Sequence, residues 1–306
     1  MYWLKRLKSR INFKEPLSRH TTLGVGGRVK VWIEPKNIAE LKVVICHCAR
    51  GQIPFMVIGK GSNLLFHDQG FKGVAIALRA PEFTELKIKG SRAYCGAGVA
   101  VAALMRQAQK QGLGGLEFLA GIPATVAGAI VMNAGTPLKG IGDLVESVQV
   151  MDKKGRLKIL LKNKLHFRYR YSNLERYIIV GVVLRLLKKD PGVIQEEISA
   201  FLKKKRHAQD LQTKSAGCIF KNPHHTLSAG AMIESCGLKG MRKGGAEISS
   251  IHANYIINRD QAQAEDILSL IRMAQREVRK KFKVSLEPEI KIIGRRGVQT
   301  GKGDKK

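Results

Sequence analysis

The sequence has 306 residues, of which 54 are Lys or Arg and 24 are Asp or Glu, a formal net charge of +30. Its hydrophobic fraction of 44% is sufficient for packed cores, so the chain as a whole is not a disordered basic segment. No apolar run reaches the roughly 18 residues of a membrane span, and the first residues lack the long apolar centre of a signal peptide. The five cysteines are an odd number, which argues against a disulfide framework. We therefore expect a cytoplasmic protein with reduced thiols, no bound metal and no membrane insertion.

The positive charge raises the question of a nucleic-acid partner. Two dense basic runs, Lys203–Arg206 and Arg279–Lys281, lie in predicted amphipathic helices, where we interpret them as solvated helix faces. Aromatic residues make up 6% of the chain and do not alternate with the basic runs, so stacking platforms for single strands are not indicated. We expect no obligatory nucleic acid, and we keep a basic nucleic-acid-binding module as an alternative.

Hydrophobic periodicity and chain breakers divide the sequence into three parts and a tail. The first part, 14–80, alternates between strand and helix, which is typical of a small α/β unit. Its predicted elements are a strand at 29–33, an amphipathic helix at 35–50, and strands at 54–58 and 73–78.

The second part, 81–190, is richer in strands. Two hairpins are indicated by turn residues between short apolar runs, and a helix ends at a glycine. The predicted elements are hairpins at 85–96 and 144–161, a helix at 99–111, and strands at 168–171 and 178–187.

The third part, 191–294, contains two helices that are separated by an expected loop. Apolar residues recur at steps of three and four in the longer helix, which predicts one buried face. The predicted elements are helices at 193–206 and 261–282, a loop at 215–223 and a closing strand at 289–293; the basic tail, 295–306, is predicted to be disordered.

Two glycine-rich segments are candidate ligand sites. Gly59-Lys60-Gly61-Ser62-Asn63 directly follows a predicted strand, and such a loop presents backbone N–H groups to an anion. A tight turn that merely ends the strand explains this loop equally well. The uncharged small residues of 120–135, which include Gly121 and Gly128, suit close packing against a flat ligand, or equally a helix against a sheet.

Three polar residues are candidates for chemistry. Arg170 stands between Tyr169 and Tyr171, where it is either held toward a carboxylate or phosphate, or exposed to water at a strand surface. Cys218 is either a reactive thiol or a buried inert one. Glu289 begins an apolar strand and is either an acid or the polar start of that strand.

The order of these motifs resembles the bacterial UDP-N-acetylenolpyruvoylglucosamine reductases, flavoenzymes of peptidoglycan precursor synthesis. The resemblance extends from about Pro16 to Gly294. It rests on Thr21-Thr22-Leu23-Gly24-Val25-Gly26-Gly27, Gly59–Leu65, Gly121–Gly135, Tyr169–Ser172, Ser215–Pro223, Gly244-Gly245-Ala246, His252-Ala253-Asn254 and Leu286–Gly294.

This resemblance implies an α+β chain. An FAD-binding fold of the vanillyl-alcohol-oxidase (PCMH) type, in subdomains 14–80 and 81–190, would precede an α/β substrate domain at 191–294. The family reduces the enolpyruvyl group of a UDP-sugar to give UDP-N-acetylmuramate, with NADPH as hydride donor. We expect a monomer or a weak oligomer. The cofactor residues implied by the match are Gly59, Lys60, Gly61, Ser62, Asn63, Leu64, Gly121, Ile122, Pro123, Thr125 and Gly128.

The match also assigns roles near the substrate. Arg170 and Glu289 correspond to the two residues that stabilise negative charge on the substrate carboxylate. Cys218 stands where the family most often has a proton-donating serine, and a thiol releases its proton more readily than a hydroxyl. The substrate-binding residues implied by the match are Tyr169, Lys221 and Asn222.

The chain departs from the family pattern at a few positions. Ala124 and Ala127 replace glycines beside the flavin, and Gln209-Asp210 replaces a Gln-Pro pair. A flavin oxidase of the same fold, acting on an alcohol and using oxygen, is the alternative within this class.

Overall fold

The computed structural model describes residues 3–4, 7–208, 213–223 and 226–298. The density of internal contacts divides the chain into two units whose segments alternate in the sequence. Unit 1 comprises Met1–Asn12, Val31–Lys60 and Val74–Lys205, and unit 2 comprises Phe13–Lys30, Gly61–Gly73 and Arg206–Lys306. The division of the sequence into parts at 80, 190 and 294 stays a prediction.

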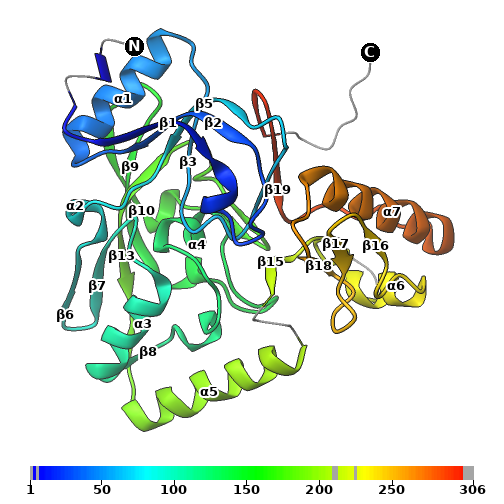
Figure 1. The fold of residues 1–306 in the computed structure, drawn as a ribbon. Coiled ribbons are helices and arrows are strands. Elements are labelled where there is room, and N and C mark those ends of the chain that lie inside the picture. The colour runs from blue at the N-terminus through cyan, green and yellow to red at the C-terminus, as the bar shows by residue number, and fades with distance from the viewer. Residues whose placement is uncertain (1–2, 5–6, 209–212, 224–225, 299–306) are drawn as a thin grey trace. The chain divides into compact units, whose positions relative to one another are not determined.

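A five-stranded antiparallel sheet, ordered β10-β9-β13-β7-β6, lies at the centre of unit 1. Both predicted hairpins are confirmed, since β6 pairs with β7 and β9 pairs with β10. The short helix α4 packs against β13 and β7 (Figure 1). The bounds are β6 Leu86–Lys89, β7 Arg92–Gly96, β9 Val145–Met151, β10 Leu157–Leu161, β13 Ile178–Arg185 and α4 Val126–Val131.

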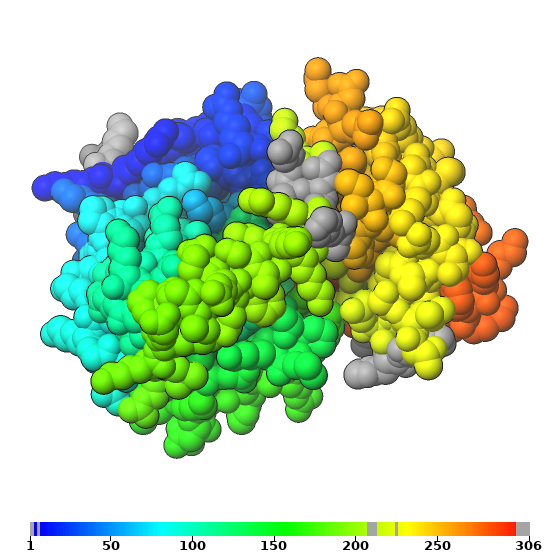
Figure 2. All heavy atoms as spheres, turned by 90° about the horizontal axis from the view of Figure 1, so that it is seen from below, coloured from blue at the N-terminus to red at the C-terminus, as the bar shows by residue number. Residues whose placement is uncertain are grey.

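The longer helices of unit 1 follow the apolar periodicity of the sequence. Helix α1, Ile38–Arg50, begins where the Asn37 side chain accepts a hydrogen bond from the Glu40 N–H, and it buries Leu41, Val44, Ile45 and Cys48. The remaining helices are α2 Pro81–Thr84, α3 Val101–Lys110 and α5 Pro191–Ala208. In the space-filling view of Figure 2, α5 is the yellow-green band across the front of unit 1.

The remaining strands of unit 1 are short. Strands β8 and β14 pair with each other, and β11 and β12 form a hairpin. A further sheet is ordered β1-β2-β5-β3, in which β3 and β5 are parallel within unit 1. The bounds are β1 Arg10–Pro16, β2 Arg28–Glu34, β3 Phe55–Val57, β5 Phe71–Ile76, β8 Leu113–Gly114, β11 Phe167–Arg168, β12 Tyr171–Ser172 and β14 Leu187–Lys188.

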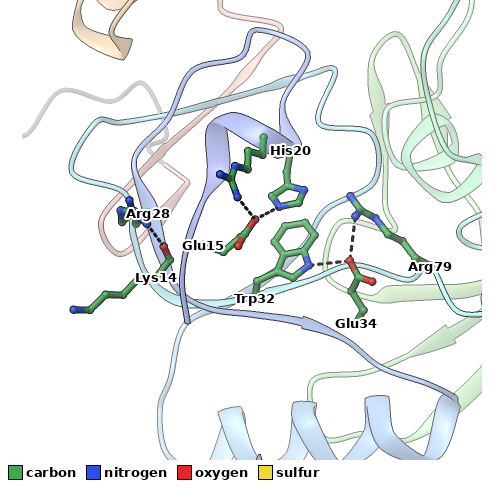
Figure 3. A network of polar contacts seen from close by, with 8 residues as sticks. Lys14, Glu15, His20, Arg28, Trp32, Glu34 and Arg79 are labelled. Atoms are coloured by element: carbon green, nitrogen blue, oxygen red, sulfur yellow. Dashed lines mark hydrogen bonds and ion pairs between the residues drawn. The ribbon is translucent and has the colours of Figure 1, made fainter. Parts of the chain in front are cut away.

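Two small polar groups hold the ends of these strands (Figure 3). In unit 1, Glu34 accepts a hydrogen bond from Trp32 Nε1 at 3.0 Å and pairs with Arg79 at 3.0 Å. In unit 2, Glu15 lies 3.1 Å from His20 Nε2. This contact holds the end of the 3-10 helix Leu17–His20, from which the chain enters the turn at 21–27.

Unit 2 has its own apolar core beneath the antiparallel sheet β15-β18-β17-β16. The predicted helix at 261–282 is confirmed as α7, Ala264–Phe282, which packs against β17 and helix α6 (Figure 1). A three-stranded sheet, β20-β19-β4, contains the parallel pair β19–β4. The bounds are α6 Ala229–Ser235, β4 Leu64–Phe66, β15 Lys214–Cys218, β16 Arg242–Lys243, β17 Ala246–Ile248, β18 Tyr255–Asn258, β19 Lys291–Gly294 and β20 Gly297–Val298.

Three local predictions are wrong. The expected strand at 168–171 is a hairpin whose turn holds Arg170 at φ +53. The expected loop at 215–223 begins within β15, which pairs with β18. The expected disordered tail includes Gly297–Val298, which pairs with β19; the rest of that prediction falls on 299–306, outside the described residues. No described helix is long and apolar enough to span a membrane.

Candidate functional site

The loop that follows β3 is shaped by close approach to neighbouring atoms. A Cβ at Gly59 would lie 2.6 Å from Thr125 Oγ1, so unit 1 brings these two predicted cofactor residues into contact. In unit 2, Gly61 has φ +67, and a Cβ there would lie 1.9 Å from the carbonyl oxygen of His20. Packing therefore restricts both positions to glycine, and at Gly61 the left-handed φ is a second reason. Lys60 is exposed and Ser62 is half-buried in the turn.

The rest of this loop is fixed within unit 2. The Asn63 Nδ2 donates to the carbonyl of Glu289 at 3.2 Å, and the Asn63 carbonyl accepts from the Lys291 N–H at 2.9 Å. Leu64 begins β4 and pairs with Lys291. The structure therefore places the predicted cofactor residues Asn63 and Leu64 directly beside the backbone of the predicted acid, Glu289.

A buried hydroxyl, that of Thr22, lies in the turn at 21–27, which contacts this loop. The Thr22 N–H donates to the Gly61 carbonyl at 3.4 Å. Thr22 Oγ1 is buried and has no hydrogen-bond partner among the described residues. A buried hydroxyl without a partner costs free energy, so this group is suited to a ligand oxygen.

The segment of small residues from Gly121 to Gly128 is bonded to the edge of the unit 1 core. The Val101 N–H donates to the Ala124 carbonyl, and the Ala127 N–H donates to the Ala97 carbonyl. Thr125 is buried and accepts a hydrogen bond from the Gly128 N–H at 3.2 Å, which caps α4. The packing of a helix against a sheet, one of the two interpretations of this segment, is thus present, and contact with a flat ligand stays a prediction.

Other members of this segment are accessible. Gly121 has φ +75 and is exposed, as is Pro123, while Ile122 is half-buried and donates its N–H to the Leu119 carbonyl. The segment therefore has one face against the core and one face open within unit 1.

Arg170 is held in unit 1 at the turn between β11 and β12. Its Nη1 donates to the Gly135 carbonyl at 3.0 Å, and its guanidinium lies 5.0 Å from the centre of the Tyr169 ring. The adjacent Ser172 is fully buried and donates to the Val131 carbonyl at 2.9 Å. The interpretation of Arg170 as a side chain that simply extends from a strand into water is therefore wrong.

Unit 2 brings the predicted thiol and the predicted acid close together. Cys218 is half-buried on β15, opposite Tyr255 of β18. The Glu289 N–H donates to the carbonyl of Ile219, the residue after Cys218, at 2.7 Å. The structure thus joins these two segments in unit 2, whereas Arg170 belongs to unit 1. That all three residues meet around one substrate stays a prediction.

Lys221 and Asn222 continue this segment. The Lys221 Nζ lies 2.6 Å from Glu287 Oε1, and its N–H donates to the Glu287 carbonyl at 2.9 Å. The Asn222 Oδ1 accepts a hydrogen bond from the Ala229 N–H at 3.1 Å, at the start of α6. Both side chains therefore have structural partners within unit 2, beside the predicted thiol and acid.

Two residues near the site were given no role of their own by sequence reasoning, although Asn254 belongs to one of the motifs of the resemblance. Asn254 is buried; it accepts from the Phe220 N–H and donates to the Phe220 carbonyl, which holds the segment that follows β15. Lys205 was included among solvated helix residues, but its Nζ donates to the Ala120 carbonyl at 2.5 Å. That interpretation is wrong for Lys205, because helix periodicity does not reveal which neighbouring segment covers a lysine. Gln209-Asp210 lies outside the described residues.

Comparison with known proteins gives two family matches. An FAD binding domain model matches residues 29–160, and the model for the C-terminal domain of UDP-N-acetylenolpyruvoylglucosamine reductase matches residues 209–293. In the part of the chain that the structure describes, no three His, Cys, Asp or Glu side chains form a group that could hold a metal ion.

Relatives and a solved structure match nearly the whole chain. The UDP-N-acetylenolpyruvoylglucosamine reductase of Moorella thermoacetica is 43% identical over 94% of this chain and 95% of its own length, and that of Desulfosudis oleivorans is 39% identical over 95% and 97%. The crystal structure of the Thermus caldophilus reductase matches with a TM-score of 0.81 and 36% identity, covering 94% of this chain and 99% of that one. The chain therefore has the expected α+β fold, with an FAD-binding part and a C-terminal domain, and it belongs to the UDP-N-acetylenolpyruvoylglucosamine reductase family.

Proposed function

We propose that this chain catalyses the reaction for which its family is named. It reduces UDP-N-acetylenolpyruvoylglucosamine to UDP-N-acetylmuramate, with FAD as its cofactor and NADPH as the hydride source. The observation that carries this proposal is 43% identity to a named reductase over 94% of the chain, together with the match to an FAD binding domain. The enzyme is an oxidoreductase of peptidoglycan precursor synthesis.

The residues of the glycine loop are suited to FAD. The buried Thr22 hydroxyl lacks a partner among the described residues and lies beside the Gly61 backbone, where it would form a hydrogen bond with a phosphate oxygen of FAD. Gly59, Lys60, Gly61, Ser62, Asn63 and Leu64 would hold the pyrophosphate, and Gly121, Ile122, Pro123, Thr125 and Gly128 would lie along the flavin. Bound FAD supplies hydride transfer from NADPH to the enolpyruvyl group. Ala124 and Ala127 make backbone bonds that need no glycine, so their methyl groups are compatible with this fold.

The side chains of this protein stabilise the negative charge on the substrate carboxylate and supply one proton to the substrate. Hydride addition next to a carboxylate places extra negative charge on that group, and Arg170 stabilises it from a side chain that Gly135 and Tyr169 already hold. Glu289, in its protonated form, donates a hydrogen bond to the same carboxylate. Cys218 delivers the final proton from its thiol. Tyr169, Lys221 and Asn222 bind the sugar nucleotide, with Lys221 facing its phosphates.

The visible spectrum tests the cofactor and the reaction together. The purified protein should be yellow, lose its flavin absorbance on addition of NADPH, and recover it when the sugar nucleotide is added. A colourless protein, or recovery with oxygen alone at the same rate as with sugar, would contradict the proposal.

Variants of Arg170 test its role. Arg170→Ala should slow reoxidation by the sugar and leave flavin reduction by NADPH unchanged. Arg170→Lys is the matched control, because both variants place a non-glycine residue at the strained φ of +53 and only the lysine keeps a positive charge. Arg170→Lys should therefore retain part of the reoxidation rate. An equal loss of both half-reactions would contradict charge stabilisation by Arg170.

Glu289 and Cys218 are tested in the same assay. Glu289→Gln keeps the size of the side chain, and Cys218→Ser restores the hydroxyl that is usual in the family. Both should affect the sugar half-reaction alone, and full turnover by Cys218→Ala would exclude that thiol as the proton donor. We further propose a cytoplasmic enzyme that is a monomer or a weak oligomer and needs no nucleic acid.

A further inference from the structure

Strand β10 forms one edge of the five-stranded sheet of unit 1, and it carries a row of exposed apolar side chains. Leu157, Ile159 and Leu161 are 44%, 69% and 58% exposed. Because side chains alternate along a strand, these three project to the same face of the sheet and extend over about 13 Å. Edge strands are usually protected by charge or by proline, so a row of large apolar residues at an edge indicates a binding surface.

The same face of the sheet is accessible beyond β10. Leu161 lies opposite Ser147 of β9. Ser147 lies opposite Val183 of β13, and Val183 lies opposite Tyr94 of β7. Directly opposed residues of antiparallel strands project to the same face, so the four side chains form one row across the sheet. Ser147 and Val183 are half-buried and Tyr94 is exposed, so the row extends the surface that begins at β10, which we call the β10 face.

Basic residues border the apolar row at β10. The segment 153–164, which contains β10 and the residues on either side of it, has six Lys or Arg residues and no Asp or Glu. Arg156 and Lys158 share one carboxylate, that of Asp152, at 2.8 and 3.7 Å. The segment therefore carries more positive charge than this carboxylate balances. Its six basic residues are all exposed: Lys153, Lys154, Arg156, Lys158, Lys162 and Lys164.

The far side of the β10 face is basic as well. Arg185 of β13 lies opposite Arg92 of β7. Both arginines pair with the one carboxylate of Glu146, at 3.2 and 2.6 Å. Lys87 of β6 lies opposite Tyr94 and pairs with Glu85 at 2.5 Å, on side chains that are both exposed. The apolar row thus lies between two basic borders within unit 1.

This combination of apolar and basic groups complements an anionic lipid surface. Lysines and arginines are attracted to the phosphates of the headgroups, while apolar side chains enter the boundary with the acyl chains. A second copy of this chain fits less well, because pairing of two β10 strands would bring two basic segments together. Nucleic acid also fits less well, because a phosphate backbone offers no apolar surface to the β10 row.

We propose that unit 1 docks through the β10 face on an anionic lipid surface. In this arrangement Leu157, Ile159 and Leu161 lie at the level of the headgroups, the basic borders contact phosphates, and no segment crosses the bilayer. The docking gives a role to part of the net charge of +30, and it is independent of the proposed reaction.

Sedimentation with vesicles tests the apolar row. The full-length protein is mixed with vesicles of equal parts of phosphatidylglycerol and phosphatidylcholine, or of phosphatidylcholine alone, and should bind only the anionic ones. The double variant Ile159→Thr, Leu161→Thr keeps every charge and should weaken this binding at least about tenfold. Phe13→Thr is the matched control, because Phe13 is 61% exposed on a strand outside the β10 face, and it should change binding less than about twofold.

Two pairs of lysines test where the charge acts. Lys153→Gln with Lys164→Gln removes two charges beside β10, and Lys203→Gln with Lys204→Gln removes the same net charge from exposed positions on α5. A lysine near an anionic surface contributes about fivefold, so the first pair should weaken binding roughly 25-fold and the second less than about threefold. All variants should keep the FAD content and the unfolding midpoint of the wild type, since the replaced side chains are exposed.

Four results would overturn the inference. Equal weakening by the two lysine pairs would show that net charge alone attracts the vesicles, and unchanged binding of Ile159→Thr, Leu161→Thr would show that the apolar row takes no part. A dimer in analytical ultracentrifugation that this threonine variant abolishes would assign the β10 face to a second copy. Tighter binding of the wild type to duplex DNA than to the anionic vesicles, weakened by the Lys153→Gln, Lys164→Gln pair, would assign it to nucleic acid.

Discussion

Gly61→Ala tests whether close approach of backbone, and not merely a turn, defines the glycine loop. At φ +67 an alanine is strained, and its Cβ would lie 1.9 Å from the His20 carbonyl oxygen and 2.8 Å from Thr21 Cα. Both contacts are with backbone, so no flexible side chain can move aside. Gly90→Ala is the matched control, because Gly90 has φ +56 and no atom within 4 Å of its added Cβ.

The two substitutions share one cost and differ in the other. A non-glycine residue in the left-handed region costs about 1–2 kcal/mol, of which the loss of chain entropy in the unfolded state offsets about 0.4–1 kcal/mol. Gly90→Ala should therefore cost about 1 kcal/mol. Gly61→Ala adds steric overlap with the segment 20–21, for which about 1–3 kcal/mol is typical of overpacked sites. We expect a total of about 2–4 kcal/mol.

Thermal unfolding followed by tryptophan fluorescence measures the difference, and visible absorbance measures retained FAD. At about 2–4 °C per kcal/mol, Gly61→Ala should lower the midpoint by roughly 4–16 °C and Gly90→Ala by roughly 2–4 °C. Gly61→Ala should also purify with less FAD, whereas Gly90→Ala should be fully yellow. Equal midpoints for the two variants would refute the argument from backbone contact.

Three further expectations concern unit 2 and the thiols. Asn254→Ala leaves the Phe220 N–H and carbonyl without their partner. The variant should therefore lose about 2–4 kcal/mol of unfolding free energy, measured in urea, and should reduce the sugar more slowly. A loss below about 1 kcal/mol would show that the chain rearranges freely there. Glu287→Gln removes the ion pair with Lys221, in which the Glu287 side chain is 70% exposed, so the free energy of unfolding should change by less than about 1 kcal/mol. The KM for the sugar nucleotide should stay equal or fall, because Lys221 is released from this pair. A rise in KM would contradict this reasoning. Burial raises the pKa of Cys48 to about 11 and that of Cys95 to about 12, so at pH 8 the folded protein holds both as thiols. After iodoacetamide treatment, mass spectrometry should find both cysteines unmodified in the folded protein and modified in urea. Rapid labelling of either cysteine in the folded state would contradict its burial.

The sequence by itself determined the elements that depend on local pattern. Helices α1, α3 and α7 follow from apolar residues at steps of three and four, and the hairpins β6–β7 and β9–β10 follow from turn residues between short apolar runs. The order of motifs also determined the family and its cofactor. Short elements such as β17, β18 and α6 have too few residues to establish a period, so sequence reasoning did not identify them.

Only the tertiary structure decided which distant residues are neighbours. It joined the segment of Glu289 to that of Cys218, and it placed Arg170 in a turn where a strand was expected. It also covered Lys205 with the Ala120 segment, although a lysine in a basic run looks like any other solvated lysine in sequence. The physical reason is that burial and partner choice depend on contacts between elements far apart along the chain, which local periodicity does not encode.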